Sequence, residues 1–174
     1  GKVALITGSS SGIGKEVAIA YAREGCDVVI NHPTGDDGQA ANAAEVAKTI
    51  SQLGCQTLIV AADITVATEV QAMVSRVIGT LGRIDILVNN VAIRPHDPFL
   101  EIDEGDWEHV INVNMNGPIW LARAALPHMI KKGWGRIINF TGMNAQRGYP
   151  GASVVSVSKH ALWGLTKALA VEFG

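Results

Sequence analysis

Features that would point to several common functions are missing from this chain of 174 residues. The formal net charge is only −2, so electrostatics give no reason to expect a nucleic acid or an anionic membrane as a partner. No apolar run approaches the roughly 20 residues of a membrane-spanning helix, and no basic, apolar leader of the signal-peptide type occurs. We therefore expect neither nucleic acid nor membrane as a binding partner.

Cysteine and clustered metal ligands are also scarce. The only two cysteines are Cys26 and Cys55, each just before an expected strand, and the thiols would lie near each other if those strands are neighbours. We expect two small buried thiols in a reducing compartment rather than a disulfide, and hence a cytoplasmic protein. No Cys/His cluster has the spacing of a zinc site, so no metal is expected.

What the sequence does contain is a regular alternation of strand-like and helix-like patterns. Short apolar runs separated by amphipathic segments are typical of a parallel sheet covered by helices on both faces. We expect an α/β protein with a Rossmann-type, doubly wound sheet in three layers, and residues 1–174 as a single dinucleotide-binding domain. The expected strands are the opening run before Gly8 and residues 27–31, 56–61, 84–89 and 136–140.

The expected helices are residues 13–24, 39–53, 66–81, 103–132 and 153–173. Thr65 is the expected N-cap of the third helix, since its hydroxyl can accept from a free backbone N–H. Pro118 lacks a donor and should kink or restart the fourth helix after Gly117.

The turn between the first strand and the first helix carries the strongest functional signal. Small residues let a backbone approach a pyrophosphate, and the start of a helix offers unpaired N–H groups and a partial positive charge. The glycines are spaced as G-x-x-x-G-x-G rather than G-x-G-x-x-G. The turn is therefore expected to bind a nucleotide. Its candidate contacts are Gly8, Ser10, Ser11, Gly12, Ile13 and Gly14.

Several stretches, in chain order, resemble the short-chain dehydrogenase/reductase family. Residues 7–14 (TGSSSGIG) resemble its T-G-x-x-x-G-I-G cofactor turn, and residues 89–92 (NNVA) its N-N-A-G stretch, with departures at 91 and 92. Residues 112–114 (NVN) resemble N-V-N, whose second Asn supports the proton relay. Residues 158–159 (SK) resemble the end of Y-x-x-S-K, and Asp63 is similar to the family's adenine-contacting Asp. The resemblance covers essentially the whole chain.

The resemblance implies an oxidoreductase that transfers a hydride between NAD or NADP and a small carbonyl or alcohol substrate. It implies the strand order 3-2-1-4-5-6-7, and we expect strands 6 and 7 and a substrate lid after Gly174. In the family, helices equivalent to 103–132 and 153–173 pair across a two-fold axis, so a homodimer or homotetramer is expected. Further implied cofactor contacts are His32, Asp63, Ile64, Asn90 and Lys159.

Two positions depart from the family's catalytic pattern. The family has a tyrosine four residues before its lysine and a serine thirteen residues before that tyrosine, which correspond here to Val155 and Gly142. Neither side chain can donate, accept or titrate. Lys159 and Asn114 are retained, so we expect the cofactor-facing half of the site without the half that handles the substrate's proton.

Two hypotheses for function remain open. In the first, the chain is an oxidoreductase in which Lys159 and Asn114 organise cofactor and water, while the proton comes from water, His96 or Tyr149. We take Asn114, Lys159 and His96 as the candidate catalytic residues. In the second, the chain is a catalytically inactive NAD(P)-binding sensor or the regulatory partner of an active subunit.

The choice between NAD and NADP is only weakly marked. An acidic residue at the end of the second strand would accept from the ribose 2′-OH of NAD, but that position is His32. The turn position that often carries a cation for the 2′-phosphate of NADP is Ser11. Asp36 and Asp37 could serve NAD if their loop folds back. Because neither Ser11 nor His32 provides a lysine or arginine to bind a 2′-phosphate, we expect a slight preference for NAD.

Overall fold

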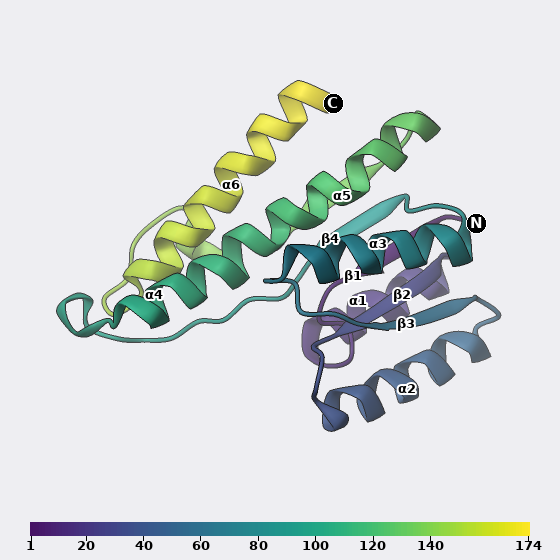
Figure 1. Cartoon of the computed structure of the whole chain (residues 1–174), viewed down its shortest axis with the longest axis horizontal. Coiled ribbons are helices and arrows are strands. Elements are labelled where there is room, and N and C mark those ends of the chain that lie inside the picture. Colours follow the sequence, from purple (N-terminus) through teal and green to yellow (C-terminus); the bar gives the residue numbers. More distant parts are fainter.

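The computed structural model describes all 174 residues as a parallel sheet with helices on both faces (Figure 1). The strands are β1 (Val3–Ile6), β2 (Asp27–His32), β3 (Thr57–Ala61), β4 (Ile86–Asn89) and β5 (Arg136–Asn139). The helices are α1 (Gly12–Arg23), α2 (Asp37–Gln52), α3 (Ala67–Leu81), α4 (Glu104–Ile111), α5 (Gly117–Lys132) and α6 (Ser153–Phe173). Short 3₁₀ turns lie at Phe99–Glu101 and Met143–Ala145, and a π-helical turn at Asn112–Asn116.

The strand order is β3-β2-β1-β4-β5, and every neighbouring pair is parallel. At the centre, Leu5 of β1 stands opposite Val29 of β2 and Leu87 of β4. The predicted doubly wound α/β class and the predicted order of these five strands are confirmed. The direction of winding reverses between β1 and β4, and this is the switch point at which sheets of this class bind ligands.

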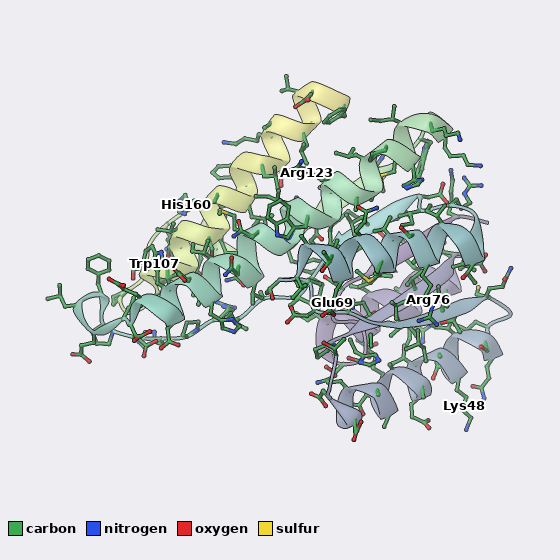
Figure 2. The ribbon with its side chains drawn as sticks, in the orientation of Figure 1. Lys48, Glu69, Arg76, Trp107, Arg123 and His160 are labelled. Atoms are coloured by element: carbon green, nitrogen blue, oxygen red, sulfur yellow. The ribbon has the colours of Figure 1, made fainter.

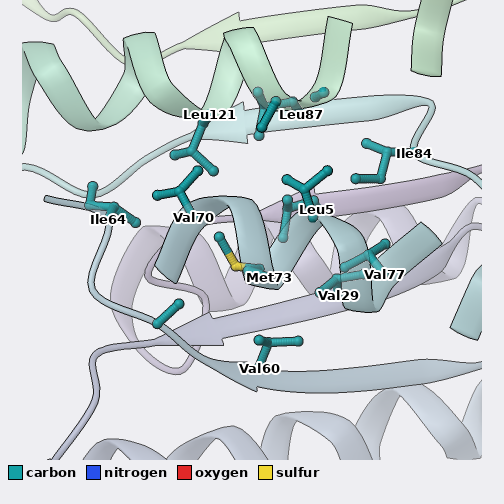
Figure 3. Close-up of a cluster of buried hydrophobic side chains, with 14 of the residues drawn as sticks. Leu5, Val29, Val60, Ile64, Val70, Met73, Val77, Ile84, Leu87 and Leu121 are labelled. Carbon is teal, nitrogen blue, oxygen red and sulfur yellow. The ribbon is translucent and has the colours of Figure 1, made fainter. Parts of the chain in front are cut away.

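Each face of the sheet buries its own hydrophobic cluster. Successive residues of a strand point to opposite faces, so Leu5 enters the cluster beneath α3 and α5, while Ile6 enters the cluster beneath α1 and α2. Figure 3 shows the first cluster, in which Met73 of α3 and Leu121 of α5 cover β1. Strands buried on both faces explain why their sequences are almost continuously apolar.

Two predicted helix starts are corrected by the structure. Thr65 is not the N-cap of α3, which begins at Ala67, because the Thr65 backbone N and Oγ1 both donate to Asp63 Oδ1, at 2.8 and 2.7 Å. Helix α2 begins at Asp37, two residues before the predicted start. The cause is Asp36, whose carboxylate accepts from Gln39 N at 2.9 Å and caps the helix.

The segment predicted as one helix at 103–132 is a continuous rod in Figure 1, but it consists of two α-helices joined by a π-helical turn. Helix α4 passes into the π turn, and α5 restarts at Gly117, at the predicted place. A Cβ at Gly117 would lie 2.9 Å from Ile64 Cδ1, so the restart lies close against the loop after β3. Pro118 stands in the first turn of α5, where its missing N–H breaks no helical hydrogen bond.

Three further observations concern membrane spans, cysteines and metal ligands. None of the helices has both the length and the apolar character needed to cross a membrane. Cys26 is buried and Cys55 half-buried, and both are free thiols. No group of three or more His, Cys, Asp or Glu side chains is placed to hold a metal ion.

A buried carboxylate, Asp85, holds the edge of the sheet opposite the switch point. It accepts from Val3 N at 2.8 Å and Arg83 Nη2 at 2.6 Å, and Lys2 Nζ lies 3.6 Å away. Burial by itself raises the pKa of this carboxyl. The hydrogen bonds from Arg83 and Val3, together with the charges of Arg83 and Lys2, outweigh burial, so the pKa of Asp85 lies below its ordinary value.

We expect Asp85→Asn to lower the free energy of unfolding by roughly 1–3 kcal/mol, because Arg83 and Val3 N lose a charged acceptor. Since the folded-state pKa is depressed, this stabilisation is complete above the unfolded-state pKa of about 4 and is lost as the pH falls through the folded-state value. Urea unfolding of both proteins from about pH 3 to pH 7 tests this. A difference between the two proteins that stays constant as acid is added would contradict it.

Candidate functional site

The loops that leave β1 and β4 are tied together by Thr7 and Asn90. Thr7 Oγ1 accepts from the backbone N of Asn90 at 3.0 Å and of Val91 at 3.2 Å. In return, Asn90 Nδ2 donates to Thr7 O at 2.9 Å. These two strands flank the switch point, so the contacts fix the position of the opening turn relative to the loop after β4.

The opening turn, residues 8–14, is tightly packed at Gly14 and open at Gly12, and we call it the cradle. A Cβ at Gly14 would lie 2.3 Å from Gly8 O and 2.6 Å from Asn90 Nδ2, so only glycine permits this approach of helix to turn. At Gly12, with φ +55°, a Cβ would meet nothing within 4 Å. The side chain of Ser11 at the N-cap makes no capping hydrogen bond. The first N–H groups of α1 therefore lack a side-chain acceptor, as an anion site at a helix start requires.

Asn31, a residue that the sequence reasoning did not single out, anchors this turn from β2. Its Oδ1 accepts from Gly8 N at 3.3 Å, and its backbone O accepts from Ser9 N at 3.0 Å. Its Nδ2 donates to Ala62 O at 3.1 Å, which links the turn to the end of β3. The signal in the sequence is an amide at the end of an otherwise apolar strand, where the buried side chain must find backbone partners.

The predicted contacts on the β2 and β3 side lie at the same edge of the sheet. His32 is buried at the end of β2, with Nδ1 2.8 Å from Pro33 O. Ser10 Oγ donates to Gln39 Oε1 of α2 at 2.6 Å. Asp63 accepts from Thr65, and Ile64 is buried under α5. The capping contact of Asp36 keeps that carboxylate on α2 rather than folded back toward His32.

Asn114 lies in the π turn and is fully buried. Its Oδ1 accepts from Ile93 N at 2.9 Å, and its Nδ2 donates to Ile93 O at 2.9 Å and lies 3.2 Å from Ser158 Oγ. The side chain thus binds the loop after β4 to the start of α6. These hydrogen bonds give Asn114 a structural role, and its predicted catalytic role stays a prediction.

Lys159 is the one buried cation at this edge, only 5% exposed. Its Nζ donates to Phe140 O, just beyond β5, at 2.7 Å, and no carboxylate lies within ion-pair distance. Burial, with a smaller contribution from the charge of Arg94, lowers the pKa of Lys159 to about 8. The neighbouring Arg94 donates to the neutral amide of Asn144 at 3.4 Å.

The structure gives a physical account of the two missing hydroxyls. Val155 is 2% exposed and packs with Val110, Val154 and Trp107 where α4 meets α6. Figure 2 labels Trp107 on α4. Gly142 has φ +74° and ψ −174°, a conformation that is essentially restricted to glycine. No atom lies within 4 Å of the position where its Cβ would stand, so the space beside it is open.

The other candidate proton donors are engaged elsewhere or exposed. Tyr149 Oη accepts from Arg147 Nε at 2.7 Å in the loop before α6. The exposed His96 packs its ring against Gly151, and no hydrogen bond joins it to Lys159 or to the opening turn. His160 points one turn back along α6, with Nδ1 2.8 Å from Ser156 O (Figure 2).

Comparison with known proteins places the chain in a family. The model of the short chain dehydrogenase family matches residues 2–174. An uncharacterized oxidoreductase of Thermotoga maritima is 39% identical over 173 residues, covering 99% of this chain and 66% of that protein. An acetoacetyl-CoA reductase of Allochromatium vinosum is 36% identical over 98% of this chain and 68% of that protein. The chain belongs to the short-chain dehydrogenase/reductase family, whose members generally use NAD or NADP.

Solved structures agree with this placement. Acetoin dehydrogenase YohF of Salmonella typhimurium superposes with a TM-score of 0.91 at 36% identity, over 98% of this chain and 66% of that one. A putative short-chain alcohol dehydrogenase of Sinorhizobium meliloti superposes with a TM-score of 0.93 at 31% identity, over 99% of this chain and 67% of that one. The chain thus spans about two thirds of the length of these proteins.

We expect Gly14→Ala to lower the free energy of unfolding by roughly 1–3 kcal/mol, because the new Cβ overlaps Gly8 O and Asn90. Gly79→Ala is the matched control, since Gly79 lies inside α3, is exposed and has no atom within 4 Å of its Cβ position. That substitution should stabilise the protein by up to about 1 kcal/mol. Urea unfolding measures both, and equal effects of the two substitutions would contradict the close approach.

Proposed function

We propose that the protein is an NAD(P)-dependent oxidoreductase that transfers a hydride between the nicotinamide and a small carbonyl or alcohol substrate. The observation that carries the proposal is the cradle at the switch point, where Gly14 lets α1 begin against the backbone of Gly8. Family membership supports it, and among the relatives the acetoacetyl-CoA reductase and the acetoin dehydrogenase carry names of this reaction type.

The residues at the carboxyl edge fit a dinucleotide. We propose that the turn Gly8–Gly14, through Ser10, Ser11, Gly12 and Ile13, holds the pyrophosphate on the uncapped start of α1. His32, Asp63 and Ile64 would bound the adenosine, and Asn90 and Lys159 the nicotinamide riboside. When bound, the cofactor supplies or accepts the hydride. The chain's own residues would then hold the two reactants in line and handle the proton.

The proposal also covers the choice of cofactor, the oligomeric state and the location of the protein. A slight preference for NAD follows from the absence of a cation at Ser11 and His32. Residues 1–174 would act as one dinucleotide-binding domain. The exposed Trp163 and Val157 of α6 support a homodimer or homotetramer that uses α6 and the α4–α5 rod. Two free thiols support a cytoplasmic location.

A catalytically inactive NAD(P)-binding sensor or regulatory subunit is the second candidate function. The observation that favours it is the loss of both hydroxyls, with Val155 buried in the contact between α4 and α6 and Gly142 in a conformation that serine rarely adopts. The two candidates share the dinucleotide cradle and differ only in turnover.

Fluorescence titration with NADH and NADPH tests the shared part of both proposals. We expect binding by the wild-type protein and by Gly79→Ala, and binding at least about tenfold weaker by Gly14→Ala, because the shifted turn misplaces the N–H groups that face the phosphates. NADH is expected to bind somewhat more tightly than NADPH. If neither nucleotide binds the wild-type protein, the proposed function is wrong.

A panel of ketones, aldehydes and alcohols, assayed with the wild type and with Gly142→Ser/Val155→Tyr, separates the two candidates. We expect wild-type turnover. If the wild type binds nucleotide without turnover and the double variant turns over, the protein is instead the inactive NAD(P)-binding sensor or regulatory subunit. The double variant should be less stable by roughly 2–6 kcal/mol, because it combines overpacking at Val155 with backbone strain at Gly142. Its unfolding must therefore be measured alongside, so that a failure to fold is not mistaken for inactivity.

A further inference from the structure

Reduction of a carbonyl needs a proton at the oxygen as well as a hydride at the carbon, and the usual hydroxyl donors are absent from this chain. Tyr149, His96 and His160 lie in contacts that leave Lys159 as the buried titratable group on the β4–β5 side of the carboxyl edge. We therefore look for the proton source at Lys159 and its surroundings. The inference below rests on the proposed function.

The ammonium group of Lys159 keeps hydrogen-bond donors that no protein group uses. Only one of the three N–H donors on Nζ is used, by Phe140 O at 2.7 Å. Gly142 lies two residues after Phe140, and a Cβ placed at Gly142 would meet no atom within 4 Å. Val155 lies one helical turn before Lys159 and packs against α4. Its side chain is apolar, so it offers no hydrogen-bonding group to Lys159.

We propose that Lys159 Nζ itself delivers the proton to the substrate oxygen, in place of the absent serine and tyrosine hydroxyls. In the direction of reduction, the bound cofactor would supply the hydride for the new C–H bond, and the carbonyl π electrons would move to oxygen. An N–H bond of Lys159 would break as the O–H bond forms. The neutral amine would then regain a proton from the solvent, so the reaction as a whole consumes the carbonyl, one hydride and one solvent proton.

The charges around Lys159 suit a lysine that gives up its proton. Arg94, in the loop after β4, is the charged group that acts on it, and it repels the ammonium. The π turn, the turn at 143–145 and the end of β5 present the neutral groups Asn114, Asn144 and Phe140 O. The titratable residues of α4 are exposed, as is His160 on α6 itself; they are Glu104, Asp106, Glu108 and His109. Burial without a carboxylate partner lowers the pKa to about 8, near the value that suits a general acid at neutral pH.

Lys159→Arg separates proton delivery from positioning. An arginine keeps the cation and the N–H donors for Phe140 O and the cofactor, but it does not release a proton at accessible pH. We expect NADH affinity within about threefold of the wild type and reductase turnover lower by roughly 10²–10⁴-fold. Lys159→Met should fold, because it removes a buried charge that has no partner. We expect it to lose as much reductase turnover as Lys159→Arg. Substantial turnover by Lys159→Arg would overturn the proposal.

A chemical rescue gives a readout that positioning alone does not move. Lys159→Cys, made with Cys26→Ala and Cys55→Ala, is alkylated with 2-bromoethylamine, which restores an ammonium of lower pKa on a side chain of nearly the same length. Reduction requires the ammonium form, so its rate falls as pH rises through the pKa of the amine. We expect turnover to return with this descending limb moved to lower pH. Recovery with an unmoved limb would assign the proton to another group and overturn the proposal.

Direct titration of the Lys159 amine by NMR, without nucleotide, keeps the two proposals distinguishable. Lys159→Met identifies its resonance, and we expect a midpoint near 8. A midpoint at the ordinary value near 10.4, together with wild-type turnover, would reject proton delivery and leave the proposed function intact. No turnover of any substrate would reject both.

Discussion

The close approach of α1 to the backbone that precedes it is the constraint on which the site depends. With hydrogen in place of a side chain at Gly14, the helix begins against Gly8 O, and its free N–H groups face outward at the switch point. The same contact draws in Asn90, whose amide binds Thr7 and so attaches the loop after β4 to the end of β1. That loop continues to Ile93, where Asn114 holds it against the π turn. One missing side chain thus sets the spacing of three elements.

The loops at this edge are held by neutral amides rather than by ion pairs. Asn31, Asn90, Asn114 and Asn144 each join two segments through hydrogen bonds, while the salt bridges of the chain gather around Asp85 at the opposite edge. Amides fix geometry without adding charge, so the field at Lys159 comes from its own burial and from Arg94. A charged network here would have returned the lysine to its ordinary pKa.

Apolar runs and glycine positions predicted the sheet class and the opening turn, because these are local signals, whereas the order of the five strands was predicted from the resemblance to the family. The sequence analysis missed Asn31, whose role depends on β3 lying beside β2. It also misplaced the start of α2, which Asp36 caps, and the N-cap of α3, because Thr65 donates to Asp63 instead. The burial of Lys159 could not be predicted, because it comes from packing between elements distant in sequence. That the serine position has a glycine-only backbone is likewise visible only in three dimensions.

The backbone at Gly142 limits how the family's usual serine and tyrosine could be restored to this chain. A serine returning there alone would meet an unfavourable φ, and a tyrosine returning alone at Val155 would have to displace the packing of α6 on α4. Each step back toward the usual pair loses folding free energy before the other residue is present to use it. Restoring the usual pair would therefore require both substitutions together with changes in the packing around them.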